Sequence, residues 1–402
     1  MIEFIHCGDL HLGCNPNRIE ERYEDFFVAF NNLIDYAINK NVRLILVSGD
    51  FFHLKVINSK TLIKTIESLN RAKENKIEVI VIEGNHDQAF YVDEDSWLYF
   101  LNKQKYLKLL QNEIIDGKIK LKLFDDETGN IIETDDYRII GLGYLGGMTE
   151  KYINDLASLI EKKHKPTVLM MHAAINRLYG QDMGDVKSEV ILKLVDKIDY
   201  IALGHIHNRY EIDDFIFNPG ALENIRLRDS KSGGEKGFYH VKITREEKEV
   251  KYILSKPRKV LYENLDLSKI KLPEKALEII KETKFDLNSG DMLELNLYGQ
   301  VDFNPYLIDI DKIKTSLQDK YDLLYLEVNN YINLETKAGE KSEIDLENIV
   351  EELIVEEIKV NYPEAKRPKH LANLMINLVD KITEDADEKT IIQMLYEEEK
   401  SI

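Results

Sequence analysis

The sequence predicts an α/β protein with a largely parallel sheet, and three observations favour this class. Short runs of β-branched residues alternate with longer segments of helical apolar spacing, which is the order expected of βαβ units. Several of these runs end directly in His, Asp or Asn, and in such sheets chemistry lies just beyond the carboxyl ends of the strands. With 402 residues and 44% hydrophobic content, the chain can also form two or three cores.

The first part of the chain predicts a βαβαβ segment. Its strands are short and rich in Ile, Leu and Val, and its helices repeat apolar residues at i, i+3 and i+4. In order, the elements are the strand Ile2–Ile5, the helix Tyr23–Ile38, the strand Leu44–Val47, the helix Asn58–Ala72 and the strand Val79–Ile82. Such a segment implies a parallel sheet.

The same patterns predict the elements that complete the first domain. These are a helix at Ser96–Leu110, strands at Ile119–Phe124 and Tyr137–Leu142, a helix around Tyr152–Lys163, a strand at Thr167–Met171, a helix near Val186–Val195, and strands at Tyr200–Leu203, Glu211–Phe217 and Gly237–Ile243.

Near residue 255 the composition changes, and a small separate α+β unit is expected. It contains strands at Val260–Leu267, Met292–Tyr298 and Leu323–Asn329 and helices at Glu274–Glu282 and Pro305–Lys320. The Lys-, Gly- and Glu-rich stretch Thr336–Ser342 is a plausible linker, and helical spacing returns in the tail.

Composition argues for a cytoplasmic protein and against a membrane protein. No apolar run approaches the roughly 20 residues that span a bilayer, and the N-terminus lacks the basic region of a signal peptide. Two cysteines fit a reducing compartment. The net charge of −19 argues against nucleic-acid binding through bulk charge. A DNA substrate would therefore need local basic loops, metal ions or a partner to attract it.

Five predicted strand ends are followed by residues that can bind metal ions. They are Asp9 and His11, then Asp50 and His53, then Asn85 and His86, then His172, and finally His205 and His207. One such segment, Gly84–Asn85, is about as often a surface turn as a site. Because the pattern recurs five times in one predicted sheet region, a shared site is the better interpretation.

The mixture of donors indicates the kind of ion. Carboxylate, amide and imidazole donors without thiolates suit Mn²⁺, Fe²⁺ or Mg²⁺, with zinc also compatible. Seven candidate ligands are too many for one ion with open positions, and they suit two ions bridged by a carboxylate. Two ions roughly 3.5–4 Å apart suit phosphoester hydrolysis, because they hold the oxygens on which charge develops.

The ordered motifs D-x-H, G-D, G-N-H-D, H and G-H-x-H resemble those of the calcineurin-like metallophosphoesterase superfamily. Within it, D-L-H-L-G, G-D-F-F-H and N-P-G-A-L-E-N-I resemble the SbcD/Mre-eleven DNA repair nucleases, over residues 1 to about 245. The resemblance implies a metallophosphoesterase β-sandwich flanked by helices, a small α+β capping domain and a helical C-terminal tail. The domains expected are a nuclease domain at 1–250, a capping and DNA-binding domain at 255–335, and a partner-binding tail at 343–402.

The resemblance also implies roles for the candidate residues. Asp9, His11 and His207 would hold one metal ion, Asn85, His172 and His205 would hold the other, and Asp50 would bridge them. Mn²⁺ is the favoured ion. His86 would lie beside the scissile phosphate and stabilise charge or protonate the leaving oxygen. Asp87 is expected to hold its loop rather than to bind metal.

His53 distinguishes branches of the superfamily. The phosphatases have an Asp at this position, followed by an Arg, whereas this chain reads G-D-F-F-H-L-K. An imidazole that faces the substrate resembles the nuclease branch, so His53 is a second candidate catalytic residue. The alternative is that His53 forms a hydrogen bond with a residue that itself binds the metal ion.

The function implied is that of a two-metal DNA exonuclease or endonuclease, the nuclease subunit of an SbcCD-like repair complex. Its partners would be DNA, an SbcC-like SMC ATPase with a long coiled coil, and a second copy of the chain. The alternative is a phosphodiesterase or phosphomonoesterase that acts on small phosphoesters. A non-catalytic scaffold is a third possibility, which the complete ligand set argues against.

Two segments are candidates for contact with DNA and with the partner. Around a Ser-Gly-Gly centre, a loop carries the basic residues Arg226, Arg228, Lys231 and Lys236, which could follow a phosphate backbone or form an ordinary solvated surface. In the tail, a helical stripe contains Leu371, Leu374, Met375, Leu378 and Ile382. This stripe could dock on the coiled-coil base or pack on its own neighbours, such as Ile349–Ile358.

Overall fold

The computed structural model describes residues 1–90, 95–161, 165–175, 186–226, 229, 234–244 and 246–334, and in the tail only 354, 355, 358, 367–369, 371, 372 and 375. Residues Met1–Leu334 form one compact unit. The predicted tail helix mostly lies outside the described residues, including Leu374, Leu378 and Ile382, whereas Leu371 and Met375 are described as helical.

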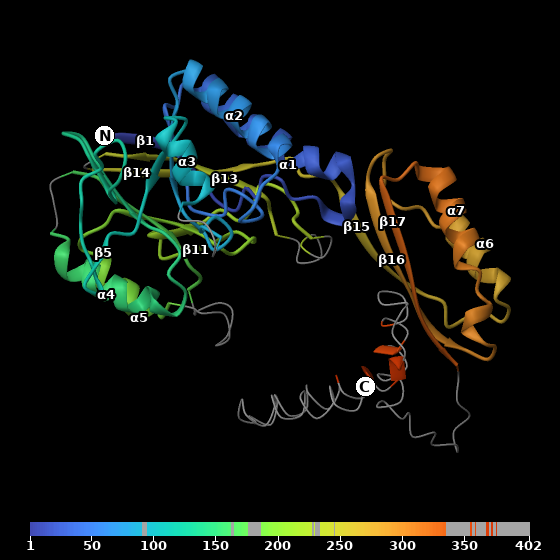
Figure 1. Cartoon of the computed structure of the whole chain (residues 1–402). Coiled ribbons are helices and arrows are strands. Elements are labelled where there is room, and N and C mark those ends of the chain that lie inside the picture. The colour runs from blue at the N-terminus through green and yellow to red at the C-terminus, as the bar shows by residue number, and fades with distance from the viewer. Residues whose placement is uncertain are drawn as a thin grey trace. The chain divides into compact units, whose positions relative to one another are not determined.

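Within the described residues, the part of the chain from β1 to β14 forms two six-stranded sheets (Figure 1). The first sheet has the order β14-β13-β1-β2-β3-β4. Its strands are β1 (Ile2–Cys7), β2 (Leu44–Val47), β3 (Glu78–Ile82), β4 (Lys108–Leu110), β13 (Gly237–Ile243) and β14 (Lys248–Leu254). Strands β1 to β4 are parallel, whereas β13 pairs antiparallel with both β1 and β14.

The second sheet has the order β11-β12-β10-β9-β8-β7. Its strands are β7 (Ile131–Glu133), β8 (Arg138–Leu142), β9 (Thr167–His172), β10 (Tyr200–Gly204), β11 (Tyr210–Ile212) and β12 (Ile216–Asn218). Strands β8, β9, β10 and β12 are parallel, and the outer strands β7 and β11 are antiparallel. A separate hairpin is formed by β5 (Ile114–Ile115) and β6 (Lys118–Ile119).

The two sheets pack face to face and helices cover their outer faces, so the predicted sandwich is confirmed. The core between the sheets contains side chains such as Phe4 and Ile80 from the first sheet and Met170 and Phe217 from the second. The helices of this region are α1 (Glu20–Lys40), α2 (Ser59–Glu74), α3 (Trp97–Lys103), α4 (Thr149–Leu159) and α5 (Ser188–Ile191), with short 3-10 turns η1 (Pro16–Arg18), η2 (Gly146–Met148) and η3 (Leu192–Leu194).

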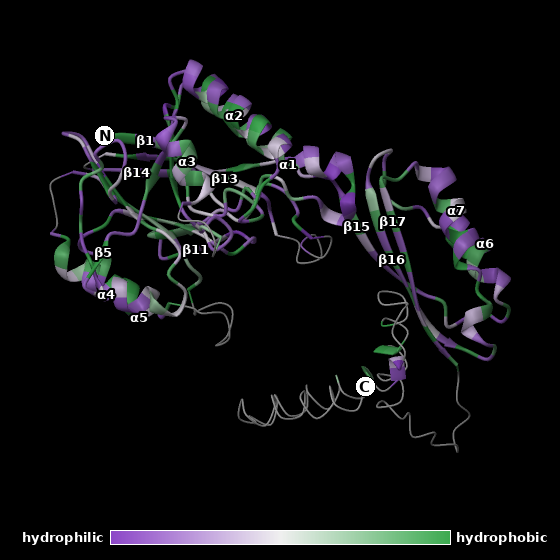
Figure 2. Ribbon diagram, in the orientation of Figure 1, coloured by the Kyte–Doolittle hydropathy of each residue, from purple (hydrophilic) through white to green (hydrophobic). Residues whose placement is uncertain are grey.

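The helices lie on opposite sides of the sandwich. Helices α1 and α2 lie on one side and α4 and α5 on the other (Figure 1). Hydrophobic and hydrophilic residues alternate along α2 (Figure 2), and its buried residues include Leu69 and Ala72. One apolar face on each helix therefore supplies the hydrophobic burial that holds it to its sheet.

Several predicted elements differ from the structure at sheet edges. The predicted helix Ser96–Leu110 ends at Lys103, and its last residues form β4. The predicted strand Glu211–Phe217 is a hairpin of β11 and β12, which turns at Asp213 and Asp214 with φ of 53° and 46°. Strand β14 was not predicted, because three of its seven residues are charged and none of them is fully buried at this edge of the sheet.

Residues 260–334 build a smaller parallel sheet with two helices around a core of their own, within the same compact unit as the sandwich. Parallel strands β15 (Val260–Asp266), β16 (Met292–Val301) and β17 (Tyr325–Leu334) have the order β15-β16-β17. Helices α6 (Glu274–Glu282) and α7 (Ile310–Tyr321) lie on one face of this sheet, and the turn η5 (Pro305–Leu307) precedes α7 (Figure 1). Leu293, Leu295 and Leu297 alternate toward that face and pack with both helices.

A buried charge network joins the sandwich to this unit. Arg22 donates to the carboxylates of Asp25 at 2.6 Å and Glu223 at 3.1 Å, and its side chain is 2% exposed. Arg258, in the connection from β14 to β15, donates two hydrogen bonds to the Asp25 carboxylate, at 2.7 and 2.8 Å. Arg258 also donates to the carbonyl oxygen of Gly290 before β16 at 2.7 Å. The two cores are therefore connected by directional contacts as well as by the chain.

Among the described residues, no helix has both the length and the apolar character needed to cross a membrane.

Candidate metal centre

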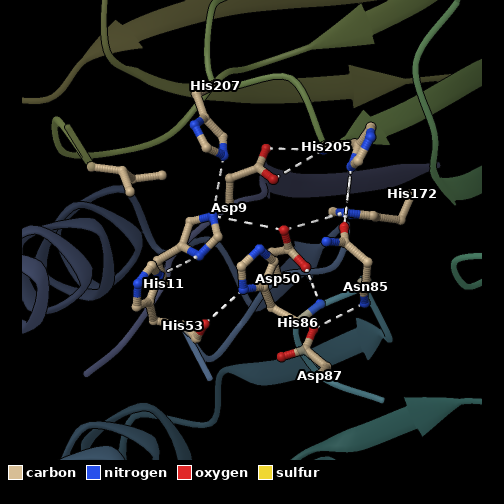
Figure 3. Close-up of polar contacts among 12 residues, drawn as sticks. Asp9, His11, Asp50, His53, Asn85, His86, Asp87, His172, His205 and His207 are labelled. Carbon is tan, nitrogen blue, oxygen red and sulfur yellow. Dashed lines mark hydrogen bonds and ion pairs between the residues drawn. The ribbon is translucent and has the colours of Figure 1, made fainter. Parts of the chain in front are cut away.

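The candidate residues lie where five strands of the sandwich end (Figure 3). Strands β1, β2 and β3 end at Cys7, Val47 and Ile82, and β9 and β10 end at His172 and Gly204. Because neighbouring parallel strands end at the same edge, their exit loops lie side by side. The backbone nitrogen of Asp9 donates to the carbonyl oxygen of Gly49, and the backbone nitrogen of His11 donates to the carbonyl oxygen of Asp50, both at 3.0 Å.

One group of donors contains Asp9, His11 and His207. One ligand atom from each lies within 4.8 Å of the others, and Nε2 of His11 is 3.2 Å from Nε2 of His207. The Asp9 carboxylate accepts from the backbone nitrogen of His205 at 2.9 Å, so the first and fifth exit loops are tied together. This group can hold one cation.

A second group contains Asp50, His172 and His205, again within 4.8 Å of one another. The amide oxygen of Asn85 joins it, 3.1 Å from Nε2 of His172 and 3.2 Å from Nδ1 of His205. Nδ1 of His172 donates to the carbonyl oxygen of Ser48 at 2.8 Å. That bond directs Nε2 toward the group, as is usual for metal-binding histidines.

Asp50 lies between the two groups. Its Oδ2 is 3.7 Å from Nε2 of His11 and 3.4 Å from Nε2 of His172. Its Oδ1 accepts from the backbone nitrogen of His86 at 3.0 Å, which fixes the carboxylate in this position. A single oxygen of Asp50 therefore faces both donor groups.

The charges of the buried donors fit cations. Burial lowers the pKa of His11 well below its ordinary value and lowers the pKa of His205 and His207 to about 4, so these imidazoles are neutral, as ligands must be. Burial and the neighbouring Asp50 carboxylate raise the pKa of Asp9 to about 7, although the charges of His172 and Lys236 act in the opposite direction. Burial acts to lower the pKa of His172 as well, but the neighbouring Asp50 carboxylate raises it to about 9. Two carboxylates, an amide oxygen and four imidazoles thus converge, and this donor set suits divalent cations.

A third group brings His53 and His86 against His11. Nδ1 of His86 donates to the carbonyl oxygen of His53 at 2.6 Å, and the two rings stack with centroids 5.6 Å apart. This bond leaves Nε2 as the free nitrogen of His86. Nδ1 of His53 is 3.3 Å from Nδ1 of His11. His53 therefore contacts His11, a candidate metal ligand. The alternative interpretation of His53, as a residue that supports a ligand, requires such a contact.

The Calcineurin-like phosphoesterase model matches residues 2–209, more than half of the chain. The chain belongs to the calcineurin-like phosphoesterase family. The predicted superfamily is thereby confirmed, and with it a metal-dependent phosphoester hydrolase.

Three curated relatives of this phosphoesterase are similar over much of its length, and each is named DNA double-strand break repair protein Mre11. The protein from Archaeoglobus fulgidus is 24% identical over 98% of this chain and 84% of the relative. The protein from Sulfolobus acidocaldarius is 24% identical over 84% and 86%, and the protein from Nanoarchaeum equitans is 24% identical over 98% and 99%. The resemblance predicted from the motifs therefore extends to residues beyond the sandwich.

Four donors of the phosphoesterase site have an unusual backbone conformation. Asp9, His11, Asp50 and His205 have φ of 51°, 45°, 50° and 97°, a region that side chains other than glycine rarely adopt. The loops also approach closely, since a Cβ atom at Gly84 would collide with the carboxylate and backbone nitrogen of Asp50. The site depends on an unusual backbone that the surrounding sheets must hold in place.

Asp87 holds the third loop, as predicted. Its carboxylate accepts from the backbone nitrogens of Phe51 at 3.0 Å, Phe52 at 2.8 Å and Gly84 at 2.9 Å. Burial raises the pKa of Asp87 to about 7 in spite of these bonds. Asp87 therefore fastens the loop after β3 to the loop after β2.

Of the four basic residues predicted to contact DNA, the structure describes Arg226 and Lys236, and these two lie in different environments. Arg226 is exposed, and Arg228 and Lys231 lie outside the described residues. The structure contradicts the surface role expected of Lys236, because Lys236 is only 3% exposed and its Nζ donates to the carbonyl oxygen of His207 at 2.8 Å. Lys236 supports the loop of a candidate ligand from inside the protein.

Sequence reasoning missed two further residues near the phosphoesterase site. The ring of Tyr144 lies beside His205, with centroids 5.7 Å apart, and an oxygen of Asp229 is 3.9 Å from Nδ1 of His207. Tyr144 follows β8 within two residues, so the strand-end rule could have found it. Asp229 belongs to a loop, where no such rule applies.

Proposed function

We propose that this phosphoesterase is a two-metal DNA nuclease that hydrolyses phosphodiester bonds in DNA repair. The observation that carries the proposal is the position of Asp50, with one oxygen within 3.7 Å of an imidazole from each donor group. Two adjacent cation sites that share a carboxylate suit in-line displacement at phosphorus. The names of two relatives that match 98% of the chain, both DNA double-strand break repair proteins, support DNA as the substrate.

The proposed division of ligands follows the two groups. Asp9, His11 and His207 hold one ion and Asn85, His172 and His205 hold the other, with Asp50 shared. Oxygen and imidazole donors without a thiolate suit Mn²⁺, Fe²⁺ or Mg²⁺, and of these we propose Mn²⁺. Bound ions supply Lewis acidity, which stabilises the charge that develops on the phosphate oxygens.

His86 is the proposed general acid. Its backbone nitrogen is fixed by Asp50 and its Nδ1 by the carbonyl oxygen of His53, so its ring has one orientation and one free nitrogen. From Nε2, an imidazolium would donate its proton to the oxygen that leaves phosphorus. The stacked ring of His53 and the contact between His53 and His11 give His53 a positioning role for both His86 and His11.

The proposal also covers how an acidic chain reaches DNA. At a net charge of −19, bulk electrostatics repels the substrate. Exposed Arg226 supplies local positive charge next to the site. We propose that an SbcC-like SMC ATPase and a second copy of this chain supply the remaining affinity for DNA in an SbcCD-like complex. The tail stripe from Leu371 to Ile382 would dock on the coiled-coil base of the ATPase.

The proposal is tested by assaying the full chain with Mn²⁺ on linear double-stranded DNA, on single-stranded DNA and on bis(p-nitrophenyl) phosphate. We expect cleavage of DNA that requires the ion and stops with a chelator. Hydrolysis of the small ester alone would contradict the nuclease and favour a small-molecule phosphodiesterase. Parallel reactions with Mg²⁺ and Zn²⁺ test the preference for Mn²⁺, which a faster reaction with Zn²⁺ would contradict.

A further inference from the structure

The sheet of residues 260–334 has a polar face that the proposed chemistry does not use. Its parallel register places side chains in rows across the three strands. The rows are Tyr262–Glu294–Glu327, Asn264–Asn296–Asn329 and Asp266–Tyr298–Tyr331. These residues alternate with the leucines that pack against α6 and α7, so the rows lie on the opposite face of the sheet.

Two of these rows have ordered side chains. Asn329 donates its amide nitrogen to the amide oxygen of Asn296 at 3.0 Å, and Asn296 donates to Asn264 at 3.3 Å. The rings of Tyr298 and Tyr331 stack with centroids 5.2 Å apart and planes 23° apart. These tyrosines are 41% and 51% exposed. The face therefore presents a rigid amide ladder beside an exposed aromatic pair.

A groove runs between this face and the sandwich. Its volume is about 490 Å³, and Asn17, Ile225 and Arg226 line it on one side, with Glu327, Asn329 and Tyr331 on the other. Pockets of this size accommodate small molecules and nucleotides.

The groove adjoins the metal centre through one loop. The backbone nitrogens of Ile225 and Arg226 both donate to Oδ2 of Asp229 at 3.1 Å. The same oxygen is 3.9 Å from Nδ1 of His207, a member of the first donor group. The loop that lines one side of the groove is therefore the same loop that contacts a member of the first donor group.

The chemistry of the groove distinguishes a base from a phosphate backbone. Glu327 and the neighbouring Glu294 repel phosphate, and Arg226 is the one cationic side chain among the described lining residues. Carboxylate and amide groups accept hydrogen bonds from the amino groups on base edges, and an exposed tyrosine offers a stacking surface to any base. Arg226 is placed to receive the adjoining phosphate.

We infer that this groove binds an unpaired nucleobase, stacked on Tyr331 and next to the amide ladder, so that the strand presented to the metal centre is single-stranded at the point of cleavage. The inference rests on the proposed nuclease function and names the class of DNA that the site takes. A base within a duplex has its amino groups paired and its faces stacked, so it enters the groove only after it has been unpaired.

The test measures binding without cleavage. A fluorescent single-stranded oligonucleotide and its blunt duplex are titrated with the full chain in a chelator at fixed salt. Tyr331→Ala is expected to weaken binding of the single strand about tenfold, the usual loss for one stacked base. Duplex binding changes much less, so the ratio of the two affinities falls. Tyr331→Phe, which keeps the ring, retains single-strand binding.

Two further variants complete the design. Tyr298→Ala, which removes the stacked neighbour, should cause a smaller loss than Tyr331→Ala. Tyr306→Ala is the matched control, because Tyr306 belongs to the same unit, is 91% exposed and does not line the groove. Equal loss of single-strand and duplex binding in Tyr331→Ala, or no loss in either, would overturn the inference.

The two proposals can fail separately. If the wild-type chain cleaves DNA but Tyr331→Ala binds single strands as the wild type does, the groove assignment is wrong and the nuclease stands. If the wild-type chain hydrolyses only the small ester, yet single-strand binding depends on the ring of Tyr331, the nuclease is wrong and the base-binding groove stands.

Discussion

The two regions of this protein place their polar residues differently on their sheets. In the sandwich, the functional side chains follow the last residues of β1, β2, β3, β9 and β10, and the loops converge so that seven donors face one small volume. In β15–β17, polar side chains stand in rows across the strands. Strand ends that converge can surround an ion, whereas side chains about 4.8 Å apart within a row form a flat surface that suits a flat ligand. The comparison associates the first region with chemistry and the second with recognition.

Removal of the Asp50 carboxylate, which lies between the two donor groups, should have the largest effect on metal binding and activity. Asp50→Ala takes away the one oxygen that faces both donor groups, so we expect both ions to be lost and phosphoesterase activity to fall to background. Elemental analysis after dialysis against Mn²⁺ measures the ions. Asp126→Ala, at an exposed acid of the same domain, is the control and should keep both ions. One tightly bound ion in Asp50→Ala would show that the two groups are independent.

His86→Ala should separate catalysis from metal binding. Because His86 lies beside the ligands and its free nitrogen is not in either donor group, we expect both ions to remain and hydrolysis to fall by about 10²- to 10⁴-fold, the usual contribution of a general acid. His240→Ala is the matched control, since His240 pairs with Glu3 on the far part of the first sheet. Loss of metal from His86→Ala would make His86 a ligand and contradict its assignment.

The charge network between the two regions should matter for stability. Glu223→Ala leaves the buried Arg22 without one of its carboxylates, and breaking a buried ion pair costs about 3–5 kcal/mol. Denaturant unfolding measures the loss, and the exposed Glu282→Ala should change stability by less than about 0.5 kcal/mol. If the network connects the regions, Glu223→Ala should also split a single transition into two. An unchanged midpoint would show that the network is dispensable.

The row of asparagines should give the smallest effect. Asn296→Ala leaves the amide nitrogen of Asn329 and the amide oxygen of Asn264 without the hydrogen-bond partner that Asn296 provides, which we expect to cost about 1–3 kcal/mol. The same measurement on Asn333→Ala, an exposed position on β17, provides the comparison. A loss equal to that of Asn333→Ala would mean that the ladder does not order the polar face.

The strand-end site was largely predictable from the sequence, and the rows were not. A motif such as G-N-H-D keeps its donors within a few residues of an apolar run, so position along the chain is enough to place Asn85 and His86 together with Asp50. The rows depend on which residues of β15, β16 and β17 lie opposite one another. Register is set by pairing in three dimensions, so the alignment of Asn264, Asn296 and Asn329 cannot be read from any one strand.

Sequence reasoning also failed where a short strand adjoins another element. Strand β4 follows α3 with the apolar residues Leu107, Leu109 and Leu110, which continue a helical pattern equally well. The helix instead stops before Lys105, whose φ is 59°, without the glycine that usually signals an end. Lys236 was expected at the surface but is buried, and the cause is similar. A loop sequence does not show which of its basic side chains points inward to support the backbone of a candidate metal ligand.

The positive φ values of Asp9, His11, Asp50 and His205 bear on the stability of this chain. Each such residue costs of order 1–3 kcal/mol, and glycine would remove most of that cost. Glycine at any of the four positions would therefore relax the backbone but would remove a donor from the site. The geometry that brings the donors together is thus obtained at a cost in folding stability, which the two sheets beneath the loops must offset.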